Sequence, residues 1–284
     1  MTNTTVQCLV LGCGAWGPGF HNWRELSELL LNPDMDELTF TKPEPKIIPA
    51  NERRRAPLLV KMAVETSCQA VVAADLPPQQ LACVFASGLG DTDITDYLCR
   101  ALTTELKQLS PTKFHNSVHN APAGYWTIST GCMEASNSIS AYRHTVGMAM
   151  FEAVSQCVEH QQPVLITVYD AQVCAVFEEL FHCKQNLALS LVIAPVTPAR
   201  TSAPLLTLST CSTHRPDTSS NLESNSRLGN NALANMLAYN PTAELAAVME
   251  SLARLEKDKQ QRITPHYLTI SPHTSIMLTM ENRK

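Results

Sequence analysis

The feature that most constrains the fold of this chain is a helical pattern followed by two strongly apolar strand patterns. Residues 146–158 repeat apolar side chains at helical spacing, whereas residues 163–169 and 187–194 are short and almost uninterrupted apolar runs. Strands of this kind are buried in a sheet that helices cover. We therefore expect an α/β fold in which layers of helices pack on a sheet.

Strand and helix patterns also alternate in the first 110 residues. In chain order they predict a strand at 6–11, a helix at 21–31, a long helix at 51–74, a strand at 81–86 and a helix at 94–109. The first strand is expected to end in a glycine-rich turn, and residues 43–49 form a proline-rich loop. Asp91, Asp93 and Asp96 are expected to cap the last of these helices.

The chain changes character after residue 195. Residues 210–231 are rich in Ser, Thr and Asn, a composition typical of an exposed and mobile linker. Beyond this tract the patterns predict a helix at 242–255 and short strands at 266–270 and 275–280. The sequence therefore predicts a main domain over residues 1–195 and a smaller C-terminal portion over residues 196–284.

Charge and composition exclude several classes of partner. The 284 residues include 21 Lys and Arg and 26 Asp and Glu, which gives a formal net charge of −5 and a pI near 6.0. Because the cations do not concentrate on one predicted face, neither nucleic acid nor an anionic membrane is an expected partner. The first apolar run lacks a basic leader and is too short to span a bilayer, so we expect a cytoplasmic protein.

The sequence predicts no metal site and no other cofactor. Ten cysteines are scattered through apolar patterns without a C-x-x-C pair, as expected for buried, reduced thiols. His115 and His119 are four residues apart, a spacing that suits two ligands on one helical face. No third ligand is near them, however, and Pro122 soon interrupts the segment.

Gly12, Gly14 and Gly17 match the G-x-G-x-x-G pattern of dinucleotide-binding proteins, but their context does not. Pro18 and Gly19 follow at once and prevent the regular helix whose N-terminus would bind the pyrophosphate. In addition, no acidic residue ends a second strand about 20 residues further on, where ribose would be bound. We therefore expect no nucleotide at these glycines.

Several short motifs between residues 114 and 170 recur in a fixed order. They are N-A-P-A-G at 120–124, T-I at 127–128 and S-I-S-A at 138–141, followed by a helix and an apolar strand. This order resembles the β-ketoacyl synthases, and residues 10–30 resemble the opening segment of the same family. The resemblance covers residues 7–195 and implies a thiolase-like, layered α/β/α fold whose C-terminal half is reduced here.

Two alignments place the catalytic cysteine of that family at different positions. One sets residues 128–132 on I-S-T-A-C, so that Cys132 is the nucleophile, and the other runs without a gap from Gly124 and puts Arg143 there. The thiol of a condensing enzyme lies at the N-terminus of a buried helix, which lowers its pKa. Since the helical pattern begins near Arg143, while residues 131–140 alternate like a strand, we favour the second alignment.

An arginine at the nucleophile position implies an inactive subunit. A guanidinium cannot carry an acyl group as a thioester and is not deprotonated in proteins. The histidine motifs of the family, H-G-T-G-T and G-G-H-N, are also missing, because His214, His266 and His273 have no flanking glycines. The sequence therefore predicts a ketosynthase-like chain with no catalytic residues.

Within this family the chain resembles the short chain length factors of aryl polyene biosynthesis. That resemblance implies a heterodimer with a catalytic β-ketoacyl synthase, which elongates an acyl chain on an acyl carrier protein bound through the catalytic subunit. It implies an interface strand that pairs edge to edge with the partner, formed by Asn137, Ser138, Ile139, Ser140, Ala141 and Tyr142. It also implies gating residues near the partner's acyl pocket, namely His115, Val118, His119 and Trp126, and Trp126→Ala is expected to lengthen products.

Two other functions are compatible with the same residues. The chain is an active condensing or acyl-transfer enzyme if Cys132 is the nucleophile, with His144 or His119 as its base. Alternatively, it is a free-standing acyl-binding scaffold without a ketosynthase partner. The cluster of Arg53, Arg54, Arg55 and Lys61 is expected to form a solvated or salt-bridged helix start, or else to contact the acidic carrier protein.

Overall fold

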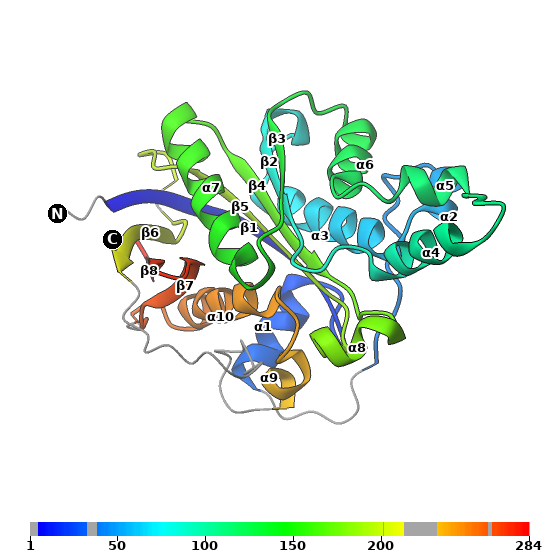
Figure 1. The fold of residues 1–284 in the computed structure, drawn as a ribbon. Helices are drawn as coiled ribbons and strands as arrows, with labels where there is room; N and C mark the ends of the chain where they lie inside the picture. The colour runs from blue at the N-terminus through cyan, green and yellow to red at the C-terminus, as the bar shows by residue number, and fades with distance from the viewer. Residues whose placement is uncertain (1–4, 33–38, 201, 213–231, 261–262, 284) are drawn as a thin grey trace.

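The structure is a computed structural model that describes residues 5–32, 39–200, 202–212, 232–260 and 263–283. Its centre is one eight-stranded sheet of order β3-β2-β4-β5-β1-β6-β8-β7 (Figure 1). In chain order the strands are β1 Thr5–Trp16, β2 Ala82–Ala86, β3 Ser136–Ile139, β4 Val164–Asp170, β5 Leu187–Pro195, β6 Leu205–Ser212, β7 His266–Ser271 and β8 Thr274–Glu281. Strands β3, β2 and β4 run parallel, and every other neighbouring pair is antiparallel.

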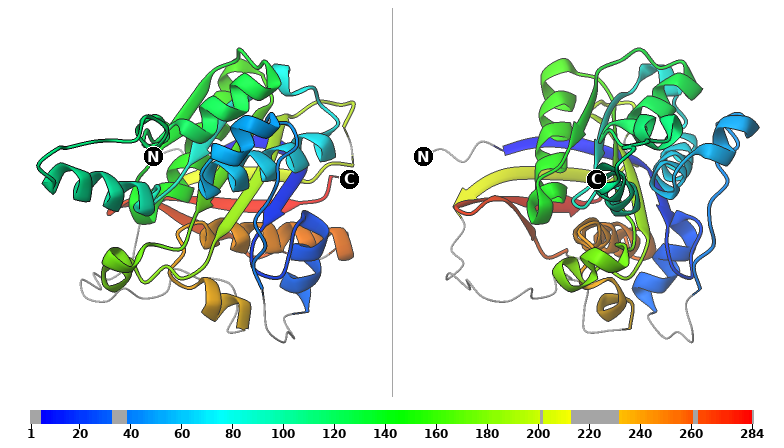
Figure 2. Two further views of the ribbon diagram at one scale, coloured as in Figure 1. Left: turned by 90° about the vertical axis from the view of Figure 1, so that its right-hand side faces the viewer. Right: turned by 45° about the vertical axis from the view of Figure 1, so that its right-hand side comes forward.

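Helices cover both faces of the sheet. They are α1 Trp23–Leu31, α2 Ala50–Arg55, α3 Leu58–Ala74, α4 Thr92–Thr103, α5 Pro111–His115, α6 Ala121–Thr130, α7 Thr145–His160, α8 Ala175–Phe181, α9 Ala232–Leu237 and α10 Ala243–Lys257. The core under one face is built with α3 and α6, and the core under the other with α1, α7, α9 and α10 (Figures 1 and 2). The expected α/β/α layering is therefore confirmed.

The period of two along each strand divides the apolar side chains between the two cores. In β2, for example, Cys83 and Phe85 belong to the core that contains α3, whereas Val84 and Ala86 belong to the core that contains α7. All five residues of β2 and all seven of β4 are buried. This explains why both strands read as continuous apolar runs.

The first strand continues through the glycines, so the predicted turn after residue 11 is wrong. A Cβ atom on Gly12 would lie 2.2 Å from the carbonyl oxygen of Ala70, and one on Gly14 would lie 2.0 Å from that of Thr66. Both oxygens belong to α3. The glycines thus serve close packing of α3 on β1, because a larger residue would push the helix away.

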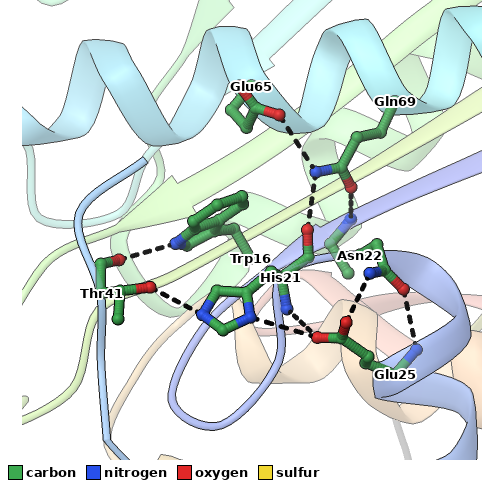
Figure 3. Close-up of polar contacts among 8 residues, drawn as sticks. Trp16, His21, Asn22, Glu25, Thr41, Glu65 and Gln69 are labelled. Carbon is green, nitrogen blue, oxygen red and sulfur yellow. Dashed lines mark hydrogen bonds and ion pairs between the residues drawn. The ribbon is translucent and has the colours of Figure 1, made fainter. Parts of the chain in front are cut away.

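Main-chain N–H groups at the end of β1 and in the turn that follows it are engaged within the chain. The N–H of Ala15 donates to Gln69 at 3.0 Å, and the N–H of His21 donates to Glu25 at 2.7 Å (Figure 3). The N–H of Gly19 donates to the carbonyl oxygen of Thr39 at 2.9 Å. These donors hold the turn to α1, to α3 and to the chain at residues 39–41.

The predicted long helix at 51–74 is two helices, α2 and α3. The break falls at Ala56 and Pro57. A proline restricts the residue before it to extended conformations, and Ala56 adopts ψ 133° accordingly. Pro57 then precedes the first turn of α3, where its missing N–H does no harm.

The predicted helix at 94–109 is shorter than expected and ends at Thr103. Asp91 is its N-cap, and its carboxylate accepts from the N–H of Ile94 at 2.9 Å. Asp93 lies in the first turn, while Asp96 instead pairs with Arg100 at 2.8 Å. Only Asp91 therefore caps the helix through its side chain.

The C-terminal segment completes the sheet. The helix predicted at 242–255 and the strands predicted at 266–270 and 275–280 are confirmed as α10, β7 and β8. Residues 210–212 of the predicted linker end β6, and residues 213–231, with His214, lie outside the described residues. Because β6 pairs with β1, the segments on both sides of the predicted boundary at residue 195 share one sheet.

Among the helices that the structure describes, none is long and apolar enough to cross a bilayer.

Candidate functional site

Polar side chains gather where the parallel strands β2 and β4 end, which is where ligand sites of open α/β sheets lie. Asp170 ends β4 and is fully buried. Its Oδ1 accepts from the Ser87 hydroxyl at 2.8 Å and from the N–H of Leu89 at 2.9 Å. Its Oδ2 accepts from the Thr242 hydroxyl at 3.0 Å. Asp170 therefore ties the loop after β2 to the C-terminal segment.

Burial raises the pKa of Asp170 to about 6, although the hydrogen bonds to its carboxylate act in the opposite direction. The network extends to Asn240, whose Nδ2 donates to the carbonyl oxygens of Asp170 at 3.3 Å and Gln185 at 2.8 Å. No role for Asp170 was predicted from the sequence. A charged residue at the end of the apolar run 164–169 is the signal that would have indicated it.

Two cavities lie next to this network. The larger, of about 600 Å³, lies between α2, α3, α4, α5 and the loop before α8, and Arg55, Asp93, Lys113, Asn116 and Cys174 are among its lining residues. The smaller, of about 210 Å³, is lined by Ser87, Leu89, Val118, His119 and Tyr169, among others. Asp91 contributes to both. The end of the sheet is thus hollow on the side of α4 and α5.

Arg143 lies directly before the central helix α7. A single 3-10 turn, Tyr142–His144, precedes the first residue of α7, Thr145. Tyr142 has φ +49°, an uncommon backbone conformation for a residue with a bulky side chain. The guanidinium of Arg143 lies 5.4 Å from the centre of the Tyr142 ring. The residue aligned with the catalytic cysteine is therefore next to the helix head, as the favoured alignment requires.

Cys132 lies just beyond the C-terminus of α6, and β3 separates it from α7 along the chain. It is 3% exposed, and its sulfur lies 3.4 Å from the carbonyl oxygen of Leu81, as does that of Cys83. The hydrogen bond between the two thiols lowers the pKa of Cys132 and, with burial, raises that of Cys83. Cys132 is thus the more easily ionised thiol of a buried pair.

The two imidazoles considered as bases for Cys132 hydrogen-bond elsewhere. His119 Nε2 lies 3.3 Å from the carbonyl oxygen of Ser87, and His144 Nδ1 lies 2.9 Å from Thr269 Oγ1. Cys132 also lines neither of the two cavities described above. The structure therefore does not assemble a thiol and imidazole pair around this residue.

The structure brings together only two of the four predicted gating residues. Val118, which is 53% exposed, and His119 line the smaller cavity. His115 is exposed at the end of α5, where its ring meets the Tyr125 ring edge-on at 6.5 Å. Trp126 is 1% exposed within the core under α3 and lines neither cavity. Within this chain Val118 and Trp126 therefore do not line one cavity, and the gating role of the four residues stays a prediction.

The burial of Trp126 also changes the meaning of Trp126→Ala. Replacing a buried tryptophan by alanine costs roughly 3–5 kcal/mol of stability. A change of product length in that variant would therefore not separate a gating role from loss of the fold. Val118, which is half-exposed, is the better residue for that test.

The predicted interface strand is shorter than expected. Strand β3 spans Ser136–Ile139, and residues 140–141 are irregular before the 3-10 turn. Among the described residues β3 pairs with β2 alone, so its other edge has no strand neighbour. The carbonyl oxygens of Ala135 and Ile139 accept from β2 at 2.8 and 3.1 Å, so the N–H and C=O of Ser138 face the open edge.

In the described parts of the chain no three His, Cys, Asp or Glu side chains are grouped so as to hold a metal ion. His115 ends α5 and His119 lies in the loop after it, so the two do not share a helical face.

Comparison with known proteins assigns the family. The family model described as "Beta-ketoacyl synthase, N-terminal domain" matches residues 22–260. A search of curated protein sequences found no significant match.

Solved structures with ketosynthase chains are similar over nearly the whole length. One belongs to a ketosynthase in complex with its chain length factor from Xenorhabdus doucetiae, with a TM-score of 0.68, 16% identity and coverage of 96% of this chain and 99% of that one. The ishigamide ketosynthase/chain length factor matches with a TM-score of 0.70 and 11% identity, and the match covers 98% of this chain and 100% of that one. A structure of a type II polyketide synthase acyl-carrier protein in complex with its ketosynthase matches with a TM-score of 0.72 and 12% identity. That match covers 98% of this chain and 100% of the other. The chain therefore belongs to the β-ketoacyl synthase family and has its thiolase-like fold.

Proposed function

We propose that this chain is a non-catalytic chain length factor of aryl polyene biosynthesis. It pairs with a catalytic β-ketoacyl synthase and shapes the acyl pocket of that partner while an acyl chain is elongated on a carrier protein. The observation that carries the proposal is Arg143 at the head of α7. A guanidinium forms no thioester and does not act as a base, so the acyl chain must be carried by the other subunit.

The segment of the chain that leads into β3 supports the heterodimer. Of the nine large apolar side chains in the described residues that are more than half exposed, six lie between residues 102 and 133. These six are Leu102, Leu106, Phe114, Val118, Ile128 and Met133. Exposed apolar side chains are typical of interaction sites, and the open edge of β3 follows this segment directly in the chain.

The full coverage of the matched chains also supports this role. The chain covers 99% and 100% of matched chains from two structures of a ketosynthase with a chain length factor. A factor of this kind needs no nucleophile of its own, because the chemistry belongs to the partner.

One observation favours the alternative of an active enzyme, namely the lowered pKa of Cys132. A thiolate is the reactive form of cysteine, so this shift is in the direction that catalysis requires. The thiol is nevertheless 3% exposed, and neither proposed base is hydrogen-bonded to it. We therefore rank this function second.

The test of the proposed function is reconstitution with the catalytic ketosynthase from the native operon. We expect the two chains to co-purify, the isolated chain to form no acyl-enzyme, and the pair to make products of defined length. Val118→Ala is expected to lengthen products and Val118→Phe to shorten them, because the side chain is 53% exposed and adds no core packing.

The matched controls are Val72→Ala and Val72→Phe on α3, where the side chain is 79% exposed. They are expected to leave product length unchanged. Condensation by the isolated chain would contradict the proposal, as would a product length that is the same with and without it.

A further inference from the structure

A pair of buried cysteines beside the strand β3 carries an inference that is independent of the proposed function. Cys83 lies on β2 and is fully buried, and Cys132 follows α6 and is 3% exposed. Both side chains belong to the core that is built with α3 and α6, and neither lines one of the two cavities. The two thiols therefore lie inside the protein, and the proposed function assigns them no role.

One carbonyl group brings the two sulfurs together. The sulfurs of Cys83 and Cys132 each lie 3.4 Å from the carbonyl oxygen of Leu81, so they are no more than twice that distance apart. The N–H of Cys83 also donates to the carbonyl oxygen of Ala135 at 2.8 Å, and β3 begins at the next residue. The contact thus joins β2 to the segment that leads into β3.

The end of α6 fixes the position of Cys132 in this contact. Gly131 ends the helix with φ +69°, the left-handed conformation that favours glycine. The N–H of Cys132 then donates to the carbonyl oxygen of Thr127 at 3.1 Å. Cys83 is fixed as well, because β2 lies between β3 and β4 in the sheet. Both thiols are therefore held by regular structure and not by a loose loop.

The two thiols differ in how readily they ionise. The hydrogen bond between them lowers the pKa of Cys132 and, with burial, raises that of Cys83. Burial raises the pKa of five other thiols in the part of the chain that the structure describes, namely Cys8, Cys13, Cys68, Cys157 and Cys183. A thiolate is the form of cysteine that peroxides oxidise, and a neighbouring thiol can then resolve the product as a disulfide.

We propose that Cys83 and Cys132 form a disulfide with each other when the protein meets hydrogen peroxide. The Cys132 thiolate attacks one peroxide oxygen, and the O–O bond breaks. Cys132 becomes a sulfenic acid, and the hydroxide that leaves takes up a proton to give water. The Cys83 sulfur then attacks the sulfenic sulfur, and the S–O bond breaks. The second hydroxide leaves as water with the proton of the Cys83 thiol. Two thiols and one peroxide thus give one disulfide and two waters, and two electrons pass from sulfur to oxygen.

The disulfide ties the central strand β2 to the residues that lead into the open-edge strand β3. It closes a loop of about 50 residues, and such a cross-link removes many conformations from the unfolded chain. The segment before β3 can then no longer separate from β2 without breaking a covalent bond. The oxidised chain is therefore expected to be more stable than the reduced one.

The test is peptide mapping of the purified chain after hydrogen peroxide has acted on it under native conditions. Free thiols are blocked with N-ethylmaleimide in denaturant, and mass spectrometry is carried out without reductant. We expect a cross-linked peptide that contains Cys83 and Cys132, with the mass of two hydrogens lost, and dithiothreitol should separate it. Cys132→Ala is expected to abolish the cross-link. The matched control is Cys68→Ala on α3, a thiol packed against the same core, which is expected to keep it.

Thermal unfolding gives a second measurement. The midpoint for the oxidised wild-type chain is expected to lie about 5 °C or more above that of the same sample after dithiothreitol. Cys132→Ala is expected to show no such difference.

Three results would overturn the proposal. The first is oxidation of the exposed Cys99 without a cross-link, because peroxide has then acted on the chain. The second is a disulfide between Cys132 and a different cysteine. The third is a cross-link that forms only in denaturant. The map of the wild-type chain decides among these results without any variant, so that misfolding of Cys132→Ala does not affect it.

Discussion

The two edge strands of the sheet, β7 and β3, differ in whether other parts of the chain cover them. Strand β7 is covered by the chain itself, because α7 packs so closely on it that a Cβ on Gly147 would lie 2.4 Å from the carbonyl oxygen of Thr269. His144 also bonds Thr269, and His266 Nε2 lies 2.6 Å from Ser251 Oγ of α10. Strand β3 has no such cover in the described structure, and half of its residues are exposed. One edge is thus closed by folding, whereas the other presents unpaired main-chain groups to a second chain.

Gly147→Val tests the closed edge and is expected to have the largest effect. The new side chain would overlap the main chain of β7, which cannot move without leaving the sheet, so we expect a loss of more than about 3 kcal/mol in the free energy of unfolding. Chemical denaturation measures it. The matched control is Gly124→Val in α6, where a Cβ meets nothing within 4 Å, and which is expected to change stability by about 0.5 kcal/mol or less.

Asp170 ties the loop after β2 to the C-terminal segment, and its raised pKa predicts a dependence of stability on pH. Its pKa is about 6 in the folded protein and near 4 in the unfolded chain, so the folded state binds the proton more tightly. Its contribution is fully present below about pH 4 and is lost as the pH rises through 6, by about 3 kcal/mol in all. The measurement is the free energy of unfolding between pH 4 and pH 7.

The control for this prediction is Asp170→Asn, which does not titrate. Its stability is expected to be lower throughout, because an amide nitrogen would face the donors of Ser87, Leu89 or Thr242. The decrease between pH 4 and 6 should be smaller in this variant than in the wild type. Parallel curves for the two proteins would show that Asp170 is not the titrating group.

Ser138→Pro tests the open edge. The N–H of Ser138 faces away from β2, so a proline there removes a hydrogen-bond donor only from the free edge. We expect the isolated chain to stay folded and its affinity for the ketosynthase to fall about 100-fold, which is about 2.7 kcal/mol. Sedimentation or titration calorimetry with the purified partner gives the dissociation constant.

Two further substitutions serve as controls for Ser138→Pro. Ser138→Ala keeps the main-chain donor and is expected to pair normally. Asn137→Pro removes a donor that faces β2, and is expected to destabilise the isolated chain as well. If Ser138→Pro pairs as tightly as Ser138→Ala, the partner does not add a strand at this edge.

The layered fold was predictable because strand and helix periods are local properties of the sequence. The strand β4 and the helices α7 and α10 were found in this way. The helix α6 was not predicted, since Gly124 and the β-branched Thr127, Ile128 and Thr130 are weak helix formers, and it is stabilised by packing on α3. The extension of β1 through Gly12 and Gly14 was likewise missed, because close approach of α3 is a tertiary contact.

In the candidate site, too, the features that follow from a local sequence pattern were predicted and those that depend on tertiary contacts were not. The position of Arg143 before α7 follows from a local pattern and was predicted. The network of Ser87, Asp170 and Thr242 was not, because its members are separated by 83 and 72 residues in the chain. Burial of Trp126 was also missed, since its place in the sequence did not distinguish a core side chain from one that lines a pocket.

The smallest effect on activity is expected for substitution of Cys132, which lies between α6 and the open-edge strand β3. Although its pKa is lowered, the thiol is buried and bonded to the Leu81 carbonyl, so a reagent must wait for a local opening of the chain. We expect Cys132→Ala to leave the product length and rate of the reconstituted pair unchanged.

Mass spectrometry after treatment with cerulenin should find the partner's nucleophile modified and Cys132 unmodified. Exposed Cys99 serves as the internal control for nonspecific alkylation. Selective labelling of Cys132 over Cys99, together with loss of condensation in Cys132→Ala, would show that this chain is an active enzyme. It would refute the proposal that only the partner is catalytic.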